Sequence, residues 1–247
     1  MYTLYVLVAF IGCSWGFPSG STNVNNRIVG GKDTTIQEHP YQVSILYNDE
    51  YHSCGGSLIS EKWVLTAGHC IDSFKFYIRV GSSLEGEGGA VHRALKQYRH
   101  EKFDAKTVDY DYGLIELDTP VQLSENVKLV KLAEPGVELE EGTLLNVTGW
   151  GSRRSSAALQ IVTVPYVSEE VCKKSHSDRL ISPYMFCAGK MSGGEGPCNG
   201  DSGGPVVSNG IQYGIVSWSF GCALPNYPSV FAKVSAIRDW IKDISGV

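Results

Sequence analysis

The chain has 247 residues, of which 43% are hydrophobic, 19% are charged and 28 are glycine. This composition excludes a highly charged disordered chain and is typical of a compact protein rich in turns. Lysine and arginine number 21 against 26 aspartates and glutamates, so the formal net charge is -5. Because proteins that bind nucleic acids or anionic membranes usually carry a basic surplus, we expect neither as a partner.

An apolar run opens the chain at residues 4–13 and is followed by the small residues Ser14 and Gly16. A membrane-spanning helix needs about 20 apolar residues, so this run is too short to span and instead suits a secretory signal. We expect residues 1–16 to be that signal, which makes the protein secreted and extracellular. The alternative is a buried N-terminal strand. The polar stretch at 17–27 has no core-forming pattern and predicts a short propeptide.

Residues 28–247 are the predicted domain, along which short apolar or alternating runs are separated by turn residues. The clearest runs are at 41–46, 62–67, 76–81, 144–150, 214–218 and 230–234. Many β-rich segments at close spacing, with abundant glycine, indicate an all-β barrel or sandwich. Only the C-terminus has helical spacing. Its apolar face is formed by Val234, Ile237, Ile241 and Ile244, with Ser235 near the start.

Two acidic segments, at 85–89 and 136–142, are expected to be solvated loops. The first of them offers only Glu85 and Glu87 as acidic ligands. A hard cation takes six or more oxygen ligands, so we expect no metal in this loop, and the sequence indicates no cofactor.

Seven cysteines are present, and Cys13 falls within the predicted signal. The remaining even number, in an oxidising compartment, predicts disulfides, although the sequence alone does not choose among the pairings. No CxxC pair occurs, which disfavours a zinc site. The six cysteines of the domain are Cys54, Cys70, Cys172, Cys187, Cys198 and Cys222.

Three segments carry a histidine, an aspartate and a serine in contexts that suit catalysis. A serine hydroxyl is a poor nucleophile unless a base takes its proton, and that base needs a group that orients it and supports its charge. A Ser, a His and an Asp supply these roles from any chain order, and nearby backbone N–H groups then face the developing oxyanion. The segments are LTAGHC at 65–70 with His69, DYDYGLIEL at 109–117 with Asp111, and GDSGGP at 200–205 with Gly200 and Ser202.

The chain resembles the trypsin/chymotrypsin family of serine proteases over residues 28–247. The resemblance implies two packed six-stranded antiparallel β-barrels with a C-terminal α-helix, and an active site between the barrels. It also implies the disulfides Cys54–Cys70, Cys172–Cys187 and Cys198–Cys222. The segments that carry it, in family order, are IVGG at 28–31, LTAGHC, DYDYGLIEL, GWG at 149–151, GDSGGP and IVSW at 215–218.

By this resemblance, His69 matches the general base, Asp111 its orienting carboxylate and Ser202 the nucleophile, with Gly200 and Ser202 at the oxyanion-hole positions. Asp109 lies two residues before Asp111 and would point the same way on a strand. The family motif, however, places the acid directly before Tyr-Gly-Leu, which favours Asp111. The resemblance implies a serine endopeptidase that hydrolyses protein or peptide substrates through an acyl-enzyme.

The specificity pocket departs from that of trypsin-like members, which carry Asp six residues before the nucleophile where this chain has Gly196. A buried Lys or Arg would lack its counter-charge there, at a cost of roughly several kcal/mol. We therefore expect chymotrypsin-like or elastase-like cleavage, after aromatic, Leu, Met or small apolar residues, and the choice between aromatic and small residues stays open. The substrate-binding positions are Gly196, Pro197, Ser217, Trp218, Ser219 and Ser229, where the last two replace the common glycine and narrow the slot.

The resemblance also implies a zymogen. The activating cut follows Arg27, and the freed amine of Ile28 pairs with Asp201, which orders the pocket and the oxyanion hole. Because a pocket without an acid handles a bond after arginine poorly, the activator should be a separate trypsin-like protease. We expect a monomer, with protein protease inhibitors as further partners.

Two other interpretations stay open. One is trypsin-like specificity through a substitute acid from a neighbouring loop. The other is a catalytically inactive family member, or another β-barrel, that acts as a binding protein, although inactive relatives usually lose one of the three catalytic residues and here all are present. Separately, Asn146-Val147-Thr148 is a glycosylation sequon in a predicted strand, and its use depends on whether Asn146 faces solvent.

Overall fold

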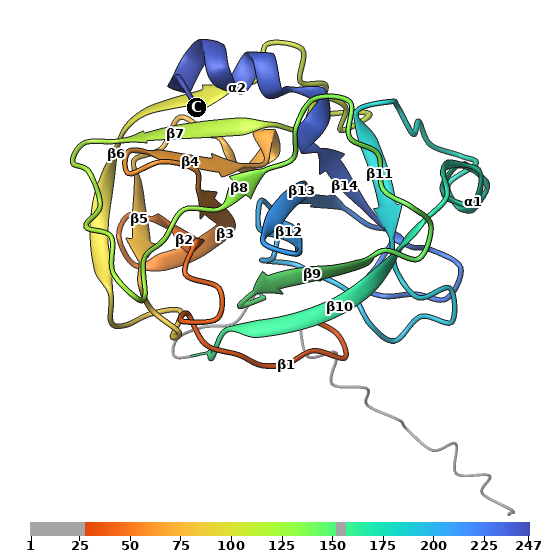
Figure 1. Ribbon diagram of the computed structural model, residues 1–247, viewed down its shortest axis with the longest axis horizontal. Coiled ribbons are helices and arrows are strands. Elements are labelled where there is room, and N and C mark those ends of the chain that lie inside the picture. The colour runs from red at the N-terminus through yellow and green to blue at the C-terminus, as the bar shows by residue number, and fades with distance from the viewer. Residues whose placement is uncertain (1–27, 152–156) are drawn as a thin grey trace, which may run out of the picture.

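The computed structural model describes residues 28–151 and 157–247, and the predicted signal and propeptide lie outside this part of the chain. Its strands close into two six-stranded antiparallel β-barrels that lie side by side, with the helix α2 (Arg238–Ser245) along the top of the view in Figure 1. The predicted all-β class, the two barrels and the C-terminal helix are therefore confirmed.

The first barrel follows from sequences in which every second side chain points inward. In β5 (Phe76–Val80), Phe76, Ile78 and Val80 are buried and the residues between them are half-buried. The other strands are β2 (Gln42–Tyr47), β3 (Tyr51–Leu58), β4 (Trp63–Thr66), β6 (Ala90–Arg99) and β7 (Gly113–Leu117). Their hydrogen-bonded order is β2-β3-β4-β7-β6-β5, and pairing of β5 with β2 closes the ring.

The second barrel uses strands from later in the chain. These are β9 (Leu144–Gly149), β10 (Gln160–Val167), β11 (Met185–Ala188), β12 (Pro205–Ser208), β13 (Ile211–Trp218) and β14 (Ser229–Lys233). The ring closes because β9 pairs with both β10 and β12. Val147, Val164 and Phe231 in its core are inaccessible to solvent. Two short strands lie outside the rings: β1 (Lys32–Asp33) pairs with β10, and β8 (Lys131–Leu132) runs parallel to β13.

The C-terminal helix begins later than its apolar spacing suggested. Val234–Ala236 form a 3₁₀ turn, and α2 starts at Arg238 with Ile237 at the N-cap, so Ser235 does not begin the helix. Ile241 is fully buried and fixes α2 to the core. Within residues 28–151 and 157–247, no helix is long and apolar enough to cross a membrane.

A second helix, α1 (Glu169–Ser175), contradicts the expectation that only the C-terminus is helical. It has seven residues and buries only Cys172, so it carries no apolar stripe that a periodicity search could detect. Its sequence signal is electrostatic instead. Glutamates lie in its first turn and Lys173 and Lys174 in its last, an arrangement that the helix dipole favours.

The acidic segment at 85–89 is not wholly solvated, because Glu85 is only 5% exposed. Leu84 forms a bridge with Ala158, and the Glu85 N–H donates to the Ala157 carbonyl at 3.1 Å. Burial raises the pKa of the Glu85 carboxyl. The prediction of a solvated loop is therefore wrong for this residue, whereas the acidic segment at 136–142 is mostly exposed as expected.

Three disulfides, Cys54–Cys70, Cys172–Cys187 and Cys198–Cys222, cross-link the domain in the pairing that the resemblance implied. Their partners are 16, 15 and 24 residues apart in the sequence. Closing loops of this size typically stabilises a fold by roughly 3 kcal/mol each. The first disulfide also ties the turn that carries His69 to β3.

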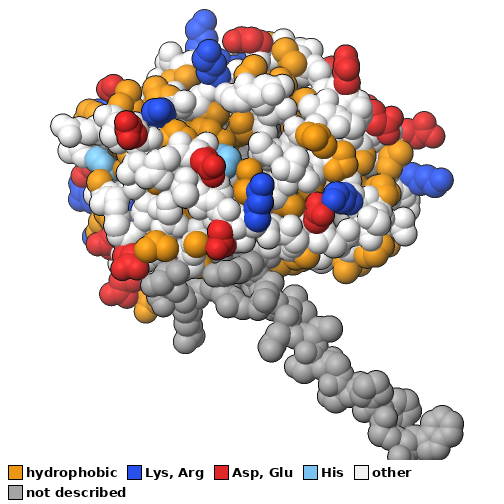
Figure 2. All heavy atoms as spheres, turned by 60° about the horizontal axis from the view of Figure 1, so that its bottom comes forward, with side chains coloured by type: hydrophobic (Ala, Val, Ile, Leu, Met, Phe, Trp, Pro, Cys, Tyr) orange, Lys and Arg blue, Asp and Glu red, His pale blue; other side chains and the backbone are white. Residues whose placement is uncertain are grey.

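Charged side chains are dispersed over the surface that can be seen. On the face in Figure 2, basic side chains lie among acidic ones and are not gathered into one large patch. Exposed ion pairs such as Lys173–Glu169 and Arg93–Asp118 contribute little to stability. On this face, the described residues thus form no continuous basic surface.

Candidate active site

His69 and Asp111 are brought together by two paired strands. β4 and β7 are antiparallel with Thr66 opposite Gly113, so the residues after β4 meet those before β7. His69 lies in the 3₁₀ turn Gly68–Cys70. Its Nδ1 is 2.8 Å from Oδ2 of Asp111, and its backbone N–H donates to Oδ1 at 2.7 Å. The carboxylate therefore orients both the ring and the backbone of this histidine.

Asp111 is buried and is also held from the second barrel. It is 1% exposed, whereas the His69 side chain is 32% exposed. Ser217 of β13 donates its hydroxyl to Oδ2 at 2.6 Å. The adjacent Tyr112 is fully buried, and its hydroxyl donates to the Lys233 carbonyl of β14 at 3.0 Å. The segment that carries Asp111 is thus anchored to both barrels.

Asp109 lies in a different environment from Asp111. The two acids are not on a strand, since β7 begins only at Gly113 and Tyr110 between them has a φ of +50°. The condition for a shared direction, that both acids lie on a strand, is therefore not met. Asp109 instead accepts a hydrogen bond from the Ser182 hydroxyl at 2.5 Å. Of the two acids, Asp111 is the one that contacts the histidine.

Ser202 lies in the glycine-rich loop that precedes β12. Its carbonyl accepts the Gly55 N–H at 2.8 Å, which fastens the loop to the first barrel. Gly203 has a φ of +78°, and a Cβ there would collide with Oγ1 of Thr66, so this close approach requires glycine. Ser202 and His69 line the same cavity, which brings the expected nucleophile and the expected base to one place.

Two backbone N–H groups beside the nucleophile, those of Gly200 and Ser202, have no acceptor within the described residues. These are the positions expected to face an oxyanion. The Gly200 carbonyl is held by His52, whose Nε2 donates to it at 2.8 Å, while the Ser44 hydroxyl donates to Nδ1 at 2.7 Å. Burial lowers the pKa of His52, which favours the neutral ring that can accept and donate at once.

The role of His52 had no signal in the sequence. It lies in β3, and the glycine that it contacts is 148 positions away. His52 lies outside LTAGHC, and no motif marks it as functional. Only the packing of the two barrels against each other brings His52 to the glycine-rich loop.

Asp201, which directly precedes the nucleophile, is fully buried. Its Oδ1 accepts the Gly151 N–H and its Oδ2 accepts the Cys198 N–H, each at 2.9 Å. In the intact chain, burial raises the pKa of this carboxyl to about 7 despite these two hydrogen bonds. A cation placed beside it would lower that pKa.

The raised pKa of Asp201 predicts how the stability of the intact chain depends on pH. The folded state holds this proton more tightly than the unfolded state, where the carboxyl has its usual pKa of 3.8. The contribution of this carboxyl to the free energy of unfolding is therefore full below pH 4 and is lost as the pH rises to about 7. The total loss is on the order of 4 kcal/mol. Urea unfolding between pH 4 and 8 measures it, and Asp201→Asn should flatten the profile. Parallel profiles for the two chains would contradict the prediction.

A hollow of about 230 Å³ adjoins Ser202 on the side of β13, and none of its lining residues is charged. Gly196 and Ser229 do not line it themselves. A Cβ on Gly196 would lie 3.6 Å from the Ser229 hydroxyl oxygen, so these two residues are neighbours, and Gly196 directly precedes Pro197 of the lining. The other four predicted pocket positions do line it. The full lining is Pro197, Cys198, Asn199, Ser202, Val216, Ser217, Trp218 and Ser219.

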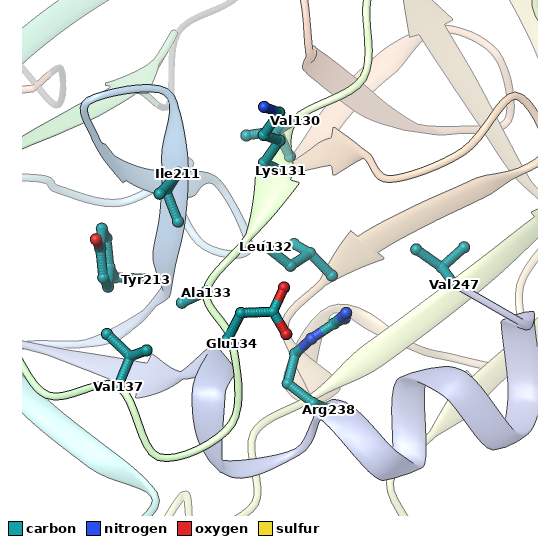
Figure 3. A pocket seen from close by; sticks show the side chains of 10 residues that line it. All are labelled: Val130, Lys131, Leu132, Ala133, Glu134, Val137, Ile211, Tyr213, Arg238 and Val247. Atoms are coloured by element: carbon teal, nitrogen blue, oxygen red, sulfur yellow. The ribbon is translucent and has the colours of Figure 1, made fainter.

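A separate, mostly aliphatic hollow of about 330 Å³ lies where β8, β13 and the C-terminal residues meet. Figure 3 shows its lining, with Glu134 and Arg238 among side chains such as Leu132, Ile211 and Val247. No residue predicted for catalysis or substrate binding lines it. The candidate active site is therefore confined to the surroundings of Ser202.

The sequon asparagine, Asn146, lies in β9 and is half-buried. Its Oδ1 accepts a hydrogen bond from the Thr163 hydroxyl at 2.7 Å. Thr148 is 1% exposed and donates to Oε1 of Gln42 at 2.6 Å. The folded sequon is thus part of the sheet, and its glycosylation stays a prediction.

Comparison with known proteins gives one consistent result. The family model described as Trypsin matches residues 28–241. Trypsin 5G1 of Aedes aegypti is 40% identical, and the match covers 99% of this chain and 98% of that protein. The vitellin-degrading protease of Bombyx mori is also 40% identical, over 88% of this chain and 85% of its own. Serine protease 1 of Rattus norvegicus is 38% identical over 96% of both chains.

Proposed function

The chain belongs to the trypsin family of serine proteases, and on this premise we propose that it is a secreted endopeptidase that cleaves after apolar rather than basic residues. The observation that carries this specificity is the hollow beside Ser202, whose lining has no charged side chain. Trypsin-like members carry Asp where this chain has Gly196. The relatives called trypsin therefore support the family of this chain, and we do not infer its substrate preference from them.

The proposed reaction uses the pair formed by His69 and Asp111. His69 takes the proton of Ser202 Oγ as that oxygen attacks the scissile carbonyl carbon, and Asp111 stabilises the imidazolium that forms. The free N–H groups of Gly200 and Ser202 donate to the oxyanion. His69 then gives its proton to the leaving amine as the C–N bond breaks. Water, activated by the same histidine, hydrolyses the acyl-enzyme.

The surroundings of the hollow do not favour a substitute acid. Glu195, next to Gly196, is paired with Lys190 at 2.6 Å. Asp201 does not line the hollow, and both of its carboxylate oxygens accept backbone N–H groups. The segment 152–156 contains no acid in its sequence. A buried Lys or Arg side chain would therefore lack a counter-charge, whereas an apolar side chain needs none.

The specificity can be measured with peptides that differ only in the residue before the scissile bond. After activation, kcat/KM for Leu, Met or Phe at this position should exceed that for Arg by about 100-fold or more, because the arginine is desolvated without a partner. Trypsin assayed with the same peptides is the control and should show the opposite order. A preference of this protein for Arg would contradict the proposed specificity.

We also propose that the chain is made as a precursor cut after Arg27. Val29 and Gly196 exchange two backbone hydrogen bonds of 2.8 and 3.0 Å, and Ile28 is 4% exposed, so the start of the domain lies against the pocket segment. We expect the new amine of Ile28 to pair with Asp201, which is buried and has no cation beside it among the described residues. Their ion pair would order the loop of Ser202.

Secretion is supported by the three disulfides, which persist in oxidising compartments. We propose that the protein acts as a monomer on proteins or peptides, with protein protease inhibitors as partners.

The second candidate function, an inactive family member that binds without cleaving, is disfavoured by the intact His69–Asp111 contact. A serine-directed phosphonate tests it, since an active enzyme forms a covalent adduct at Ser202 and an inactive one does not.

A further inference from the structure

A second cavity opens on the other side of Ser202. Its volume is about 360 Å³, and His69 and Ser202 both line it. Ser202 is shared with the uncharged hollow described above, but His69 is not. The nucleophile therefore stands between two cavities, and only one of them contains the proposed proton donor.

The position of His69 assigns the second cavity to the departing half of the substrate. In the proposed reaction, the histidine protonates the leaving amine, so the residue that carries this amine must lie on the histidine's side of the serine. The acyl half then occupies the hollow along β13. This assignment rests on the proposed function.

Part of the wall of the second cavity is aromatic. Tyr47, the last residue of β2, pairs with Phe76, the first of β5. Phe74 packs edge-on against Tyr47, with ring centroids 4.9 Å apart and planes at 88°. Its backbone is fixed by Gln97, whose Nε2 donates to the Phe74 carbonyl at 2.9 Å. Even so, Phe74 is 49% exposed, which leaves apolar surface that a ligand can cover.

Charge in the second cavity is of one sign. Asp72 is the one carboxylate that lines it, no lysine or arginine does so, and Asp72 is exposed. A carboxylate on the substrate would be repelled there, while an apolar side chain would gain by covering Phe74. The Cys54–Cys70 disulfide forms part of the wall and keeps it rigid.

We propose that this cavity is a subsite for a bulky apolar side chain, such as Leu or Phe, on the residue that follows the scissile bond. Phe74 is the specificity-determining side chain, and Asp72 excludes acidic residues. The substrate class is thereby narrowed to bonds that have apolar side chains on both sides.

The subsite can be tested separately from the acyl side by measuring how the acyl-enzyme partitions between hydrolysis by water and capture by an added amine. The activated enzyme is acylated with one leucine ester in the presence of glycine, leucine, phenylalanine, glutamate or arginine amide. The amine nitrogen bonds to the acyl carbon, the ester bond to Ser202 Oγ breaks, and the proton of the amine passes through His69 to that oxygen. Leucine and phenylalanine amides should capture the acyl group about ten-fold better than glycine amide, and glutamate amide worse than glycine amide.

Two variants and one control assign the preference to named side chains. Phe74→Ala should reduce the advantage of leucine amide over glycine amide to about two-fold, because the apolar surface that the leucine side chain covers is lost. Asp72→Asn should raise capture by glutamate amide. Phe220→Ala is the matched control, since Phe220 is also 49% exposed but stacks on Tyr227, and it should leave the ratios unchanged.

Equal capture of all amides, preference for arginine amide, or ratios that Phe74→Ala leaves unchanged would overturn the subsite while the proposed function stands. Absence of any ester hydrolysis would overturn the proposed function, and the subsite with it.

Discussion

Ser202→Ala and His69→Ala should each lower kcat by about 10⁶-fold, and kcat of the double variant should be scarcely lower than that of either single variant. The physical reason is that the two groups act as one unit: without the base the hydroxyl is not a nucleophile, and without the hydroxyl the base has no proton to take. Steady-state kinetics on one apolar peptide substrate, with active-site titration to exclude traces of wild-type enzyme, measures the effect.

The control for this prediction is His92→Ala, which removes a histidine of β6 whose ring, within the described part of the chain, forms one exposed hydrogen bond, with Thr119. This variant should retain full activity, which would show that the loss of activity is specific to His69 and does not follow from removing just any histidine. Losses that multiply in the double variant would contradict the assignment of Ser202 and His69 to one catalytic unit.

The sequence singled out the candidate catalytic side chains because their contexts are local. LTAGHC and GDSGGP place a histidine and a serine in turns whose geometry depends on adjacent residues, such as the glycine at 203 with its positive φ. The strands that lead into these turns have clear alternation. The barrels, in contrast, came from the resemblance and not from the pattern, since alternation alone left barrel and sandwich equally open.

The features that sequence reasoning missed depend on contacts between distant segments. Glu85 is buried because the segment around it forms backbone hydrogen bonds with residues 157–159. His52 reaches Gly200 only when the two barrels pack against each other. The aromatic cavity was missed for the same reason. Its wall combines Tyr47 from one strand with Phe74 from the turn before another. Helix α1 was missed because it is too short to show a period.

The mature enzyme should not activate its own precursor. The activating bond follows Arg27, and the hollow that would receive this arginine has no charged side chain. Precursor with Ser202→Ala cannot cleave itself, so it reports only cleavage by added protease. Trypsin should convert it at Arg27–Ile28 at least about 100-fold faster than the mature wild-type enzyme does, because only trypsin-like pockets supply the counter-charge.

A gain of function makes this prediction sharper. The φ of Gly196 is not positive, so a residue with a side chain can adopt its backbone conformation. A Cβ there would meet its nearest neighbours, Ala223 and Ser229, at ordinary contact distances of 3.5 and 3.6 Å. Gly196→Asp should therefore fit, and its carboxylate can accept a hydrogen bond from the buried Ser229 hydroxyl. The mature Gly196→Asp enzyme should cleave the Ser202→Ala precursor at Arg27–Ile28, and Gly196→Asn, equal in size but uncharged, should not. Rapid conversion by the wild-type enzyme would refute the uncharged pocket. Failure of Gly196→Asp to differ from Gly196→Asn would show that this position does not face the substrate side chain.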